Sequence, residues 1–390
     1  MTVVHDMDAV NALHTGATPV AVDEADGVEV IRLSSKTGLL SPLLTQQTGR
    51  PSLHRRRLAA ILDDGKFDVV NFHNASLIGG PGIFSLGKDA LRIFTAHDHW
   101  LVCPSHDLWR HSRELCTSRQ CLRCQLHHHR PPQLWRLTGL LDREIENIHV
   151  FIAMTEFSRA KHREFGFPRE MEILPQFIPD LDEGEARATG PSPHERPYFL
   201  FVGRLEKIKG LDTVIPLFRQ YPDADLIVAG DGNERDSLGE LAAGSGRVRF
   251  LGRVGSDTLR RFYSHAIATI VPSVGYETFG LVLIESFQVG TPVIARRLGP
   301  FPEILQASGG GELFATDEEL LSAMTRLQSD SSHRSALADN AIRGFRNFWS
   351  EGAVIPRYLD IVERARSAPS TAAQRLATNG RIGLEVAGKD

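Results

Sequence analysis

The sequence predicts an α/β protein of two domains, each built on its own largely parallel sheet. Two observations lead to this prediction. Short apolar runs alternate with helical patterns in both halves of the chain, as they do in βαβ units. Between the halves lies LDEGEARATGPSPHERP, residues 181–197, whose Gly, Pro and charge content is typical of an interdomain linker.

Continuous runs of Val, Ile, Leu and Phe predict the strands, because a parallel sheet covered on both faces buries every side chain. We expect strands at 2–4, 28–33, 67–73, 92–97 and 149–155, and then at 198–203, 225–230, 248–252, 267–273 and 291–295. The segments LDTVIPLFRQ, LVLIESFQVG and DEELLSAMTRLQSD predict crossover helices. The expected division is a first domain at 1–185 with an insert at 103–136, a linker at 186–197, a second domain at 198–348, a last helix at 349–366 and a loose tail at 367–390.

The composition is that of a globular chain without a strong charge bias. Its 390 residues include 44 basic and 48 acidic ones, a net charge of −4, which argues against a general nucleic-acid binder. No apolar run is long enough to span a bilayer, and the start MTVVHDMDAV lacks the basic and apolar regions of a secretory signal. We therefore expect a cytoplasmic protein.

Two cations follow the first strand of the second half. In FVGRLEKIKG the strand ends at Gly203, Arg204 follows directly, and Lys209 opens the next helix. Ligands of open α/β sheets bind at the carboxyl ends of the strands, where Arg and Lys suit a diphosphate. Two solvated loop charges are the alternative. The turn from Gly230 to Gly232 follows the next strand and would let a ligand approach the backbone, although such turns are usually structural.

Two glutamates flank an expected helix start in GYETFGLVLIE, residues 275–285. A helix that begins near 279–281 directs its free N–H groups and positive dipole end toward the strand ends, where they can hold an anion. Glu277 lies in the preceding loop, and Glu285 lies one turn after Leu281. Such carboxylates can accept hydrogen bonds from sugar and ribose hydroxyls. An exposed helix acid is the alternative for Glu285, but its apolar flanks predict burial and therefore a partner.

In order and spacing, these motifs resemble glycosyltransferase family 4, which has the GT-B fold of two Rossmann-like domains facing across a cleft. The resemblance implies retaining transfer of a sugar from a nucleotide-diphosphate sugar, with no metal required for catalysis. It assigns Arg204 and Lys209 to the donor diphosphate. It assigns Glu277 to the donor sugar and Glu285 to the ribose. The donor-binding set that it implies is Gly203, Arg204, Lys209, Gly230, Gly232, Glu277, Phe279, Gly280, Leu281 and Glu285.

In the same resemblance the first half supplies the acceptor side, and the last helix, 349–366, crosses back to this first domain. His97 ends a strand and is the candidate that faces the sugar and the acceptor, so it joins the catalytic candidates. His73 and Asn74 are candidates for lining the acceptor side, with a structural hydrogen bond as the alternative for His73. Family members open with a strand and a glycine-rich loop before a strand like TVV, so we expect the first domain to lack its first strand. A non-catalytic sugar-nucleotide binder and a GT-B-fold epimerase are therefore alternatives to a transferase.

All four cysteines of the chain fall within the insert, in the spacing C-x12-C-x4-C-x2-C: Cys103, Cys116, Cys121 and Cys124. Four thiolates predict a closed, structural zinc site. An iron–sulfur cluster uses the same ligands, and four reduced thiols in a loop are the remaining alternative. The histidines at 127–129 offer a substitute ligand.

The insert is also basic and is followed by apolar residues. The basic residues are Arg110, Arg113, Arg119, Arg123, Arg130 and Arg136, and the apolar ones are Leu134, Trp135, Leu137, Leu140 and Leu141. This combination suits anionic lipid headgroups, so peripheral contact with the inner face of the membrane is one expectation. A solvated arginine rim with a helix packed on the core is the other. The resemblance adds a glycan, lipid-linked or small-molecule acceptor as the partner.

Overall fold

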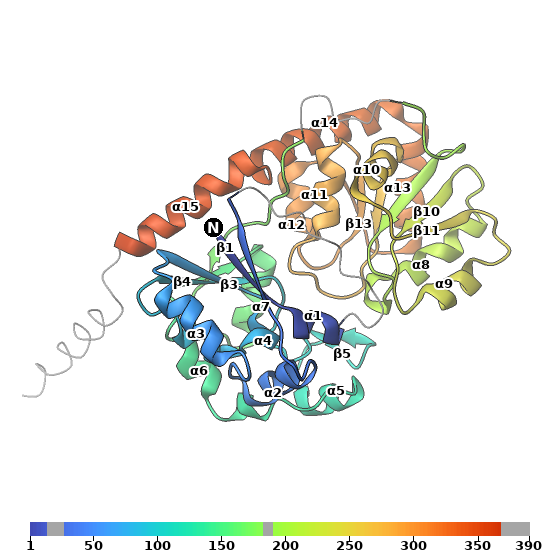
Figure 1. Ribbon diagram of the computed structural model, residues 1–390. Helices are drawn as coiled ribbons and strands as arrows, with labels where there is room; N and C mark the ends of the chain where they lie inside the picture. The colour runs from blue at the N-terminus through green and yellow to red at the C-terminus, as the bar shows by residue number, and fades with distance from the viewer. Residues whose placement is uncertain (14–26, 182–189, 368–390) are drawn as a thin grey trace, which may run out of the picture.

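The computed structural model describes residues 1–13, 27–181 and 190–367 and has parallel sheets in both halves of the chain (Figure 1). The first half holds β1 (Thr2–Asp6), β2 (Glu29–Leu33), β3 (Val69–His73), β4 (Leu91–Ala96), β5 (Trp109–Arg110), β6 (Glu114–Leu115), β7 (Val150–Ala153) and β8 (Glu172–Ile173). The second half holds β9 (Tyr198–Val202), β10 (Asp225–Ala229), β11 (Val248–Gly252), β12 (Thr269–Val271), β13 (Val293–Arg296) and β14 (Gly311–Phe314). Every strand expected from the apolar runs is present, whereas the short β5, β6, β8 and β14 were not predicted.

The second half is one six-stranded parallel sheet in the order β11-β10-β9-β12-β13-β14. Its helices are α8 (Leu211–Val214), α9 (Arg235–Ala242), α10 (Ser256–His265), α11 (Leu281–Gln288), α12 (Phe301–Ser308), α13 (Asp317–Ser329) and α14 (Ser331–Phe348). The strand β10 is buried along its whole length, because helices cover both faces of the sheet. Parallel strands bring their carboxyl ends to one edge, and the loops at that edge carry the predicted donor residues.

The first half differs from the single sheet that we expected. The strands β3, β4, β7 and β8 form a four-stranded parallel sheet, while β1 and β2 pair only with each other, from Thr2 opposite Glu29 to Asp6 opposite Leu33. Backbone groups pair only between strands about 4.8 Å apart. Among the described residues no strand pairs with both β1 and β3, so the two sheets stay separate.

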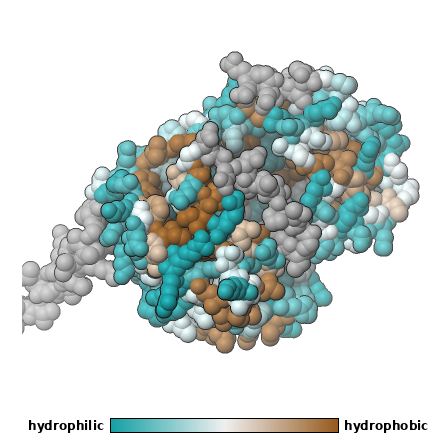
Figure 2. All heavy atoms as spheres, in the orientation of Figure 1, coloured by the Kyte–Doolittle hydropathy of each residue, from teal (hydrophilic) through white to brown (hydrophobic). Residues whose placement is uncertain are grey.

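The helices of the first half include α5, which lies within the insert. They are α1 (Met7–Leu13), α2 (Leu40–Thr48), α3 (Arg55–Asp64), α4 (Ala75–Ile78), α5 (Cys121–His127), α6 (Leu140–Ile145) and α7 (Glu156–Glu164). Figure 2 shows a hydrophobic surface at the lower end of the molecule, where Figure 1 places α2 and α5.

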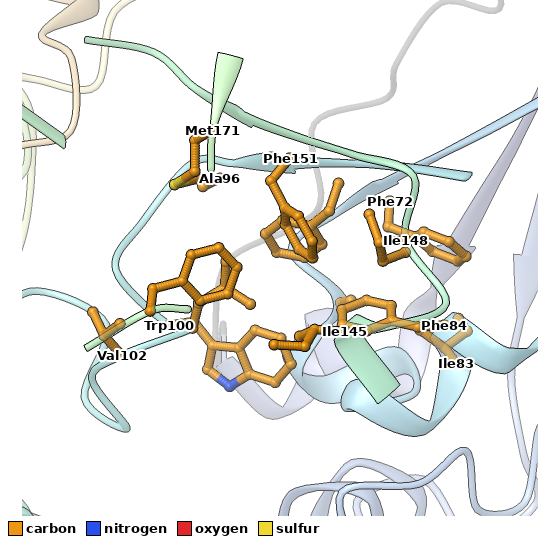
Figure 3. Packing of buried hydrophobic residues seen from close by; sticks show 14 of the residues in the cluster. Phe72, Ile83, Phe84, Ala96, Trp100, Val102, Ile145, Ile148, Phe151 and Met171 are labelled. Atoms are coloured by element: carbon orange, nitrogen blue, oxygen red, sulfur yellow. The ribbon is translucent and has the colours of Figure 1, made fainter. Parts of the chain in front are cut away.

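An aromatic cluster fills the core of the first half (Figure 3). Phe84 is fully buried and meets the edge of Phe94, with ring centroids 5.4 Å apart. Trp100 is 2% exposed and stacks on Phe94 at 6.3 Å. Trp100 lies three residues after His97, so the core anchors the strand end that carries this histidine.

The last helix, α15 (Glu351–Ser367), joins the two halves. Its buried residues Val354, Ile361 and Val362 pack in one cluster with Ile93 of β4 and Ile152 of β7. The helix therefore lies against the first sheet although it follows the second domain, as the resemblance led us to expect. The predicted tail begins at Ser367, which is instead the last residue of α15; the rest of that tail and the predicted boundary between 185 and 186 lie outside the described residues.

Candidate active site

The loop between β12 and α11 carries Glu277 at the carboxyl edge of the second sheet. The helix α11 begins at Leu281, which confirms the predicted start near 279–281. Gly280 precedes it with a φ of 123°, a conformation that residues with a Cβ rarely adopt. Glycine at this position therefore lets the chain turn into the helix directly after the loop.

Glu277 and Lys209 form an ion pair across this edge. The Lys209 ammonium donates to Glu277 Oε1 at 2.9 Å, and the Ser273 hydroxyl donates to the same oxygen at 2.6 Å. Burial acts to raise the pKa of Glu277, but the attraction and hydrogen bond of Lys209, together with Ser273, outweigh it and lower the pKa. Glu277 is therefore a carboxylate at neutral pH, held beside a cation with both side chains about one-fifth exposed (22% and 23%).

The other predicted cation, Arg204, extends into solvent beside this pair. Its side chain is 73% exposed and contacts Glu206 at 2.7 Å. The turn from Gly230 to Gly232 packs closely on the loop that carries Arg204. A Cβ on Gly230 would come within 1.9 Å of the Gly203 carbonyl oxygen, and a Cβ on Gly232 within 2.4 Å of the Leu205 carbonyl oxygen. These glycines allow two strand-end loops of the protein to approach each other, which is the structural alternative named for them above.

Glu285 has the partner that its burial requires. The Tyr263 hydroxyl donates to Glu285 Oε2 at 2.7 Å. Burial raises the pKa of Glu285, and the hydrogen bond from Tyr263 only partly opposes this shift. The prediction of a partner is confirmed, although nothing in the local sequence pointed to Tyr263, which lies on α10.

In the first half, His73 and His97 lie side by side at the carboxyl ends of β3 and β4. His73 Nδ1 and His97 Nε2 are 2.6 Å apart, so one imidazole donates to the other. Part of the His73 ring reaches solvent, yet desolvation by the surrounding protein and then the neighbouring His97 lower its pKa to about 4. Burial lowers the pKa of His97 as well, so both rings are neutral at pH 7. Asn74 follows in a left-handed conformation with φ of 45° and is exposed.

Hydrogen bonds join these two groups of residues across the domain boundary. The Thr278 hydroxyl donates to the His97 carbonyl at 2.7 Å, and the Thr155 hydroxyl donates to the Thr278 carbonyl at 2.8 Å. The ring of Tyr276 contacts Phe157 of α7, with centroids 5.1 Å apart. The residues on both sides of Glu277 in the sequence thus contact the first domain. The sequence did not reveal Ser273, Tyr276 or Thr278 as site residues. Tyr276 and Thr278 contact residues that are distant in the chain, and the bond of Ser273 to Glu277, four residues on, depends on how the loop folds.

A further group of ligand-type side chains was also missed. Among the residues that the structure describes, Asp6, Asp8 and His54 form the one group of three or more whose possible metal-ligating atoms lie within 4.8 Å of each other, and all three are buried. Asp6 Oδ1 accepts from the backbone N–H of Asp8, and His54 Nε2 lies 3.1 Å from Asp8 Oδ2. Burial raises the pKa of Asp6, which favours its neutral form. We interpret the group as a hydrogen-bonded link between β1 and the segment before α3.

The apolar residues of the insert divide between the two expectations, a lipid-facing surface and a helix packed on the core. Trp135 and Leu140 are 5% and 3% exposed, so they belong to the core and not to a lipid-facing surface. The Arg136 guanidinium lies 4.7 Å from the Trp135 ring centroid and donates to the Trp100 carbonyl. Leu137 by contrast is 86% exposed. Within the described parts of the chain, no helix is both long and apolar enough to cross a membrane.

Comparison with known proteins decides the family. The family of glycosyl transferases group 1 matches residues 182–344. A phosphatidyl-myo-inositol mannosyltransferase of Mycolicibacterium smegmatis is 30% identical over 344 residues, which cover 85% of this chain and 81% of that relative. This chain belongs to the group 1 glycosyltransferases. The matched range holds the Lys209–Glu277 pair and Glu285, so the motifs that we predicted to bind the donor lie within the family's region.

Other glycosyltransferases match shorter stretches. A lipopolysaccharide core biosynthesis glycosyltransferase, LpsE of Rhizobium meliloti, is 31% identical over 209 residues, 51% of this chain and 59% of LpsE. An uncharacterized glycosyltransferase of Methanocaldococcus jannaschii is 35% identical over 150 residues, 36% of this chain and 38% of that protein. The chain thus aligns with less than two thirds of the length of these two relatives.

Solved structures agree on the fold. The sucrose-phosphate synthase of Thermosynechococcus elongatus superposes with a TM-score of 0.62 at 21% identity, covering 91% of this chain and 87% of the synthase. HepE of Anabaena, in complex with UDP-glucose, gives a TM-score of 0.62 at 18% identity, covering 87% of this chain and 86% of HepE. These likenesses, with the parallel sheets described above, confirm the predicted GT-B fold of two Rossmann-like domains.

Proposed function

We propose that this group 1 glycosyltransferase moves a sugar, with retention of configuration and without a catalytic metal, from a nucleotide-diphosphate sugar to a glycan, lipid-linked or small-molecule acceptor. The observation that carries the proposal is the Lys209–Glu277 pair at the carboxyl edge of the second sheet. An anionic donor needs a cation there, and a sugar needs an acceptor of hydroxyl hydrogen bonds. The resemblance to glycosyltransferase family 4 supports the finer assignment, including retention.

The donor half can perform its part with protein groups alone. Lys209, with the exposed Arg204, would stabilise the charge that develops on the departing diphosphate, which is the role that a metal ion fills in other transferases. Glu277, kept anionic by Lys209, would hold the sugar hydroxyls. The hydrogen bond from Tyr263 would orient Glu285 toward the ribose. The N-terminal end of α11, behind Phe279, would add backbone N–H groups to the phosphate cradle.

The first domain would supply the acceptor side. The backbone carbonyl of His97 accepts from Thr278, next to Glu277, so the backbone at His97 lies beside the donor loop. Because the pKa values of both His73 and His97 are lowered, the pair offers neutral imidazoles that can donate to or accept from an acceptor hydroxyl. The hydrogen bond between them sets which nitrogen of each ring is free.

A donor panel tests this function. UDP-glucose, UDP-N-acetylglucosamine and GDP-mannose would each be incubated with the full chain and with glycan or lipid extracts, and release of the nucleoside diphosphate measured. We expect release with one donor class and its loss in Glu277→Gln, whose thermal unfolding should stay close to that of the wild type. Binding of UDP or GDP without any transfer would instead favour the non-catalytic binder. The anomeric configuration of the product, read by NMR, tests retention.

We also propose that the lower end of the first domain contacts an anionic membrane. Its exposed leucines, with their exposed fractions, are Leu39 (62%), Leu43 (48%), Leu122 (58%), Leu126 (59%), Leu134 (61%) and Leu137 (86%). They share one region because Gln46 of α2 donates to the Pro131 carbonyl and Trp135 donates to the Gln46 carbonyl, both at 2.9 Å. The exposed Arg123 and Arg130 flank them, and this combination suits acidic headgroups (Figure 2). The name of the mycobacterial relative, a phosphatidyl-myo-inositol mannosyltransferase, supports a lipid-linked acceptor.

Liposome flotation tests the membrane contact. The chain should float with vesicles of phosphatidylglycerol and phosphatidylcholine, less so at high salt, and a Leu126→Ser, Leu137→Ser double variant should not. The control is Leu359→Ser, which changes a leucine of α15 that is 53% exposed but lies outside this surface. Absence of binding at low salt would exclude a membrane contact of this kind.

A further inference from the structure

The four cysteines converge on one small cavity although they come from three segments. Cys103 lies in the loop after β4, Cys116 follows β6, and Cys121 and Cys124 occupy the first turn of α5. All four line a cavity of about 20 Å³, and all four are free thiols. A cavity of this size holds about one water molecule or one ion. This volume and the four sulfurs around it suit a single metal ion.

We propose that this cavity binds one structural zinc ion through the four thiolates. Zinc takes four sulfur ligands at about 2.3 Å in a closed tetrahedron, which places the sulfurs about 3.8 Å apart. The sulfurs are more widely spaced than this in the structure, because no three of them lie within 4.8 Å of one another among the described residues. Binding would draw the β5–β6 hairpin and the start of α5 together around the ion.

The backbone conformation between Cys103 and Cys116 gives an independent reason to expect such an ion. Between Cys103 and Cys116, four residues other than glycine have positive φ: His106 (79°), Leu108 (51°), His111 (52°) and Ser112 (54°). Each such conformation costs about 1 kcal/mol or more and persists only where the surroundings impose it. The backbone N–H groups of His99 and Cys116 hold the carbonyls of His106 and Leu108. His111 and Ser112, by contrast, lie in the turn between β5 and β6, and this ladder of two residue pairs cannot impose their conformation alone. A four-thiolate ion that connects the hairpin with α5 would hold this loop.

The site lies next to the donor loop, and Trp109 connects the two. Trp109 lines the cavity, is 8% exposed, and its Cε3 lies 3.3 Å from where a Cβ on Gly275 would be. Ile208 lies closer still, so only glycine fits at 275, two residues before Glu277. The ion would therefore fix Trp109 against the donor loop from the other domain. This second part of the inference rests on the proposed function, and Trp109 acts in it as a positioning residue.

Metal analysis of the full chain, purified without chelator, tests the first part independently of any activity. We expect one zinc per chain by mass spectrometry, and intense visible bands of tetrahedral tetrathiolate cobalt after exchange. The variants Cys116→Ser and Cys121→Ser should each lose the zinc, whereas His127→Ala should keep it, because the ligand set is four sulfurs. Absence of metal, iron with acid-labile sulfide, or zinc that survives both serine variants would each overturn the proposal.

The variant Trp109→Leu tests the second part even if the cysteine variants do not fold. It should keep one zinc per chain and raise the KM for the donor, or the Kd for UDP or GDP, about tenfold, with a smaller change in kcat. Loss of zinc in this variant, or unchanged donor affinity, would contradict a positioning role for Trp109. If neither nucleotide binds the wild-type chain, the proposed function fails, but the zinc content still decides the metal site.

Discussion

The ion pair of Lys209 with Glu277 makes Lys209→Met the sharpest test of the donor site. At the observed 2.9 Å, two unit charges attract by about 6 kcal/mol at an effective dielectric constant of about 20, and desolvation offsets much of this. Methionine keeps the length of the side chain and removes the charge. Loss of a hydrogen bond to a charged group lowers the free energy of unfolding by about 1.5–3 kcal/mol, so the variant should still fold.

The effect on transfer should exceed the effect on stability. If Lys209 stabilises the charge on the leaving diphosphate, its removal should lower kcat about 10²- to 10³-fold, as loss of one such group does in other enzymes. Glu277 would also lose its main source of a lowered pKa while its burial remains. The acid limb of the pH–rate profile should therefore move toward neutral pH.

The assay is release of nucleoside diphosphate from the active donor, with titration of UDP and GDP as a measure of binding. Lys207→Met is the matched control, because Lys207 lies on the same 3₁₀ turn but pairs with Asp212 and is 56% exposed. It should behave as the wild type. If Lys209→Met keeps kcat/KM within threefold of the wild type, the role assigned to Lys209 is wrong.

Three further predictions concern neighbouring contacts. Tyr263→Phe removes the donor to Glu285, so it should raise the pKa of that carboxyl and weaken binding of UDP or GDP about tenfold in a titration; an unchanged Kd would remove Glu285 from the donor site. The imidazole of His73 should titrate near pH 4 by NMR, and titration near 6.5 would contradict this. Because a histidine in the unfolded chain has the higher pKa of about 6.5, the contribution of neutral His73 to the free energy of unfolding should be lost as the pH falls from about 6.5 to 4. Gly230→Ala should lower the melting temperature far more than Gly252→Ala, since only the first would place a Cβ against the Gly203 carbonyl, while both have positive φ; equal effects would refute the close approach.

Much of the fold followed from local patterns. The apolar runs predicted the main strands, and the stretch around Gly280 predicted the start of α11 within two residues. The short strands β8 and β14 escaped because neither forms an apolar run: β8 has two residues, and β14, GELF, has apolar side chains only at its last two. The separation of the β1–β2 pair from the four-stranded sheet also escaped, since strand order depends on neighbours that the apolar pattern does not name.

The candidate site was predictable in residue types but not in partners. The burial of Glu285 required a partner, yet Tyr263 could not be chosen from the sequence, because it lies 22 residues away on another helix. The pairing of His73 with His97 was likewise hidden, although both were named as strand-end residues. In the insert, the sequence left both lipid contact and packing on the core open for Trp135, and the structure shows it buried; a composition does not tell which side of a segment meets the core.

By itself, the sequence determined the two α/β domains, the positions of Arg204, Lys209, Glu277 and Glu285 in loops and helix starts, and the clustering of the cysteines. These features depend on periodicity and spacing within a few residues, which local backbone geometry imposes. Only the tertiary structure decided that Lys209 meets Glu277 across 68 residues, that Thr278 reaches His97 in the other domain, and that Trp109 lies against Gly275. Such contacts form when packing brings distant segments together, so their partners are set by the whole fold.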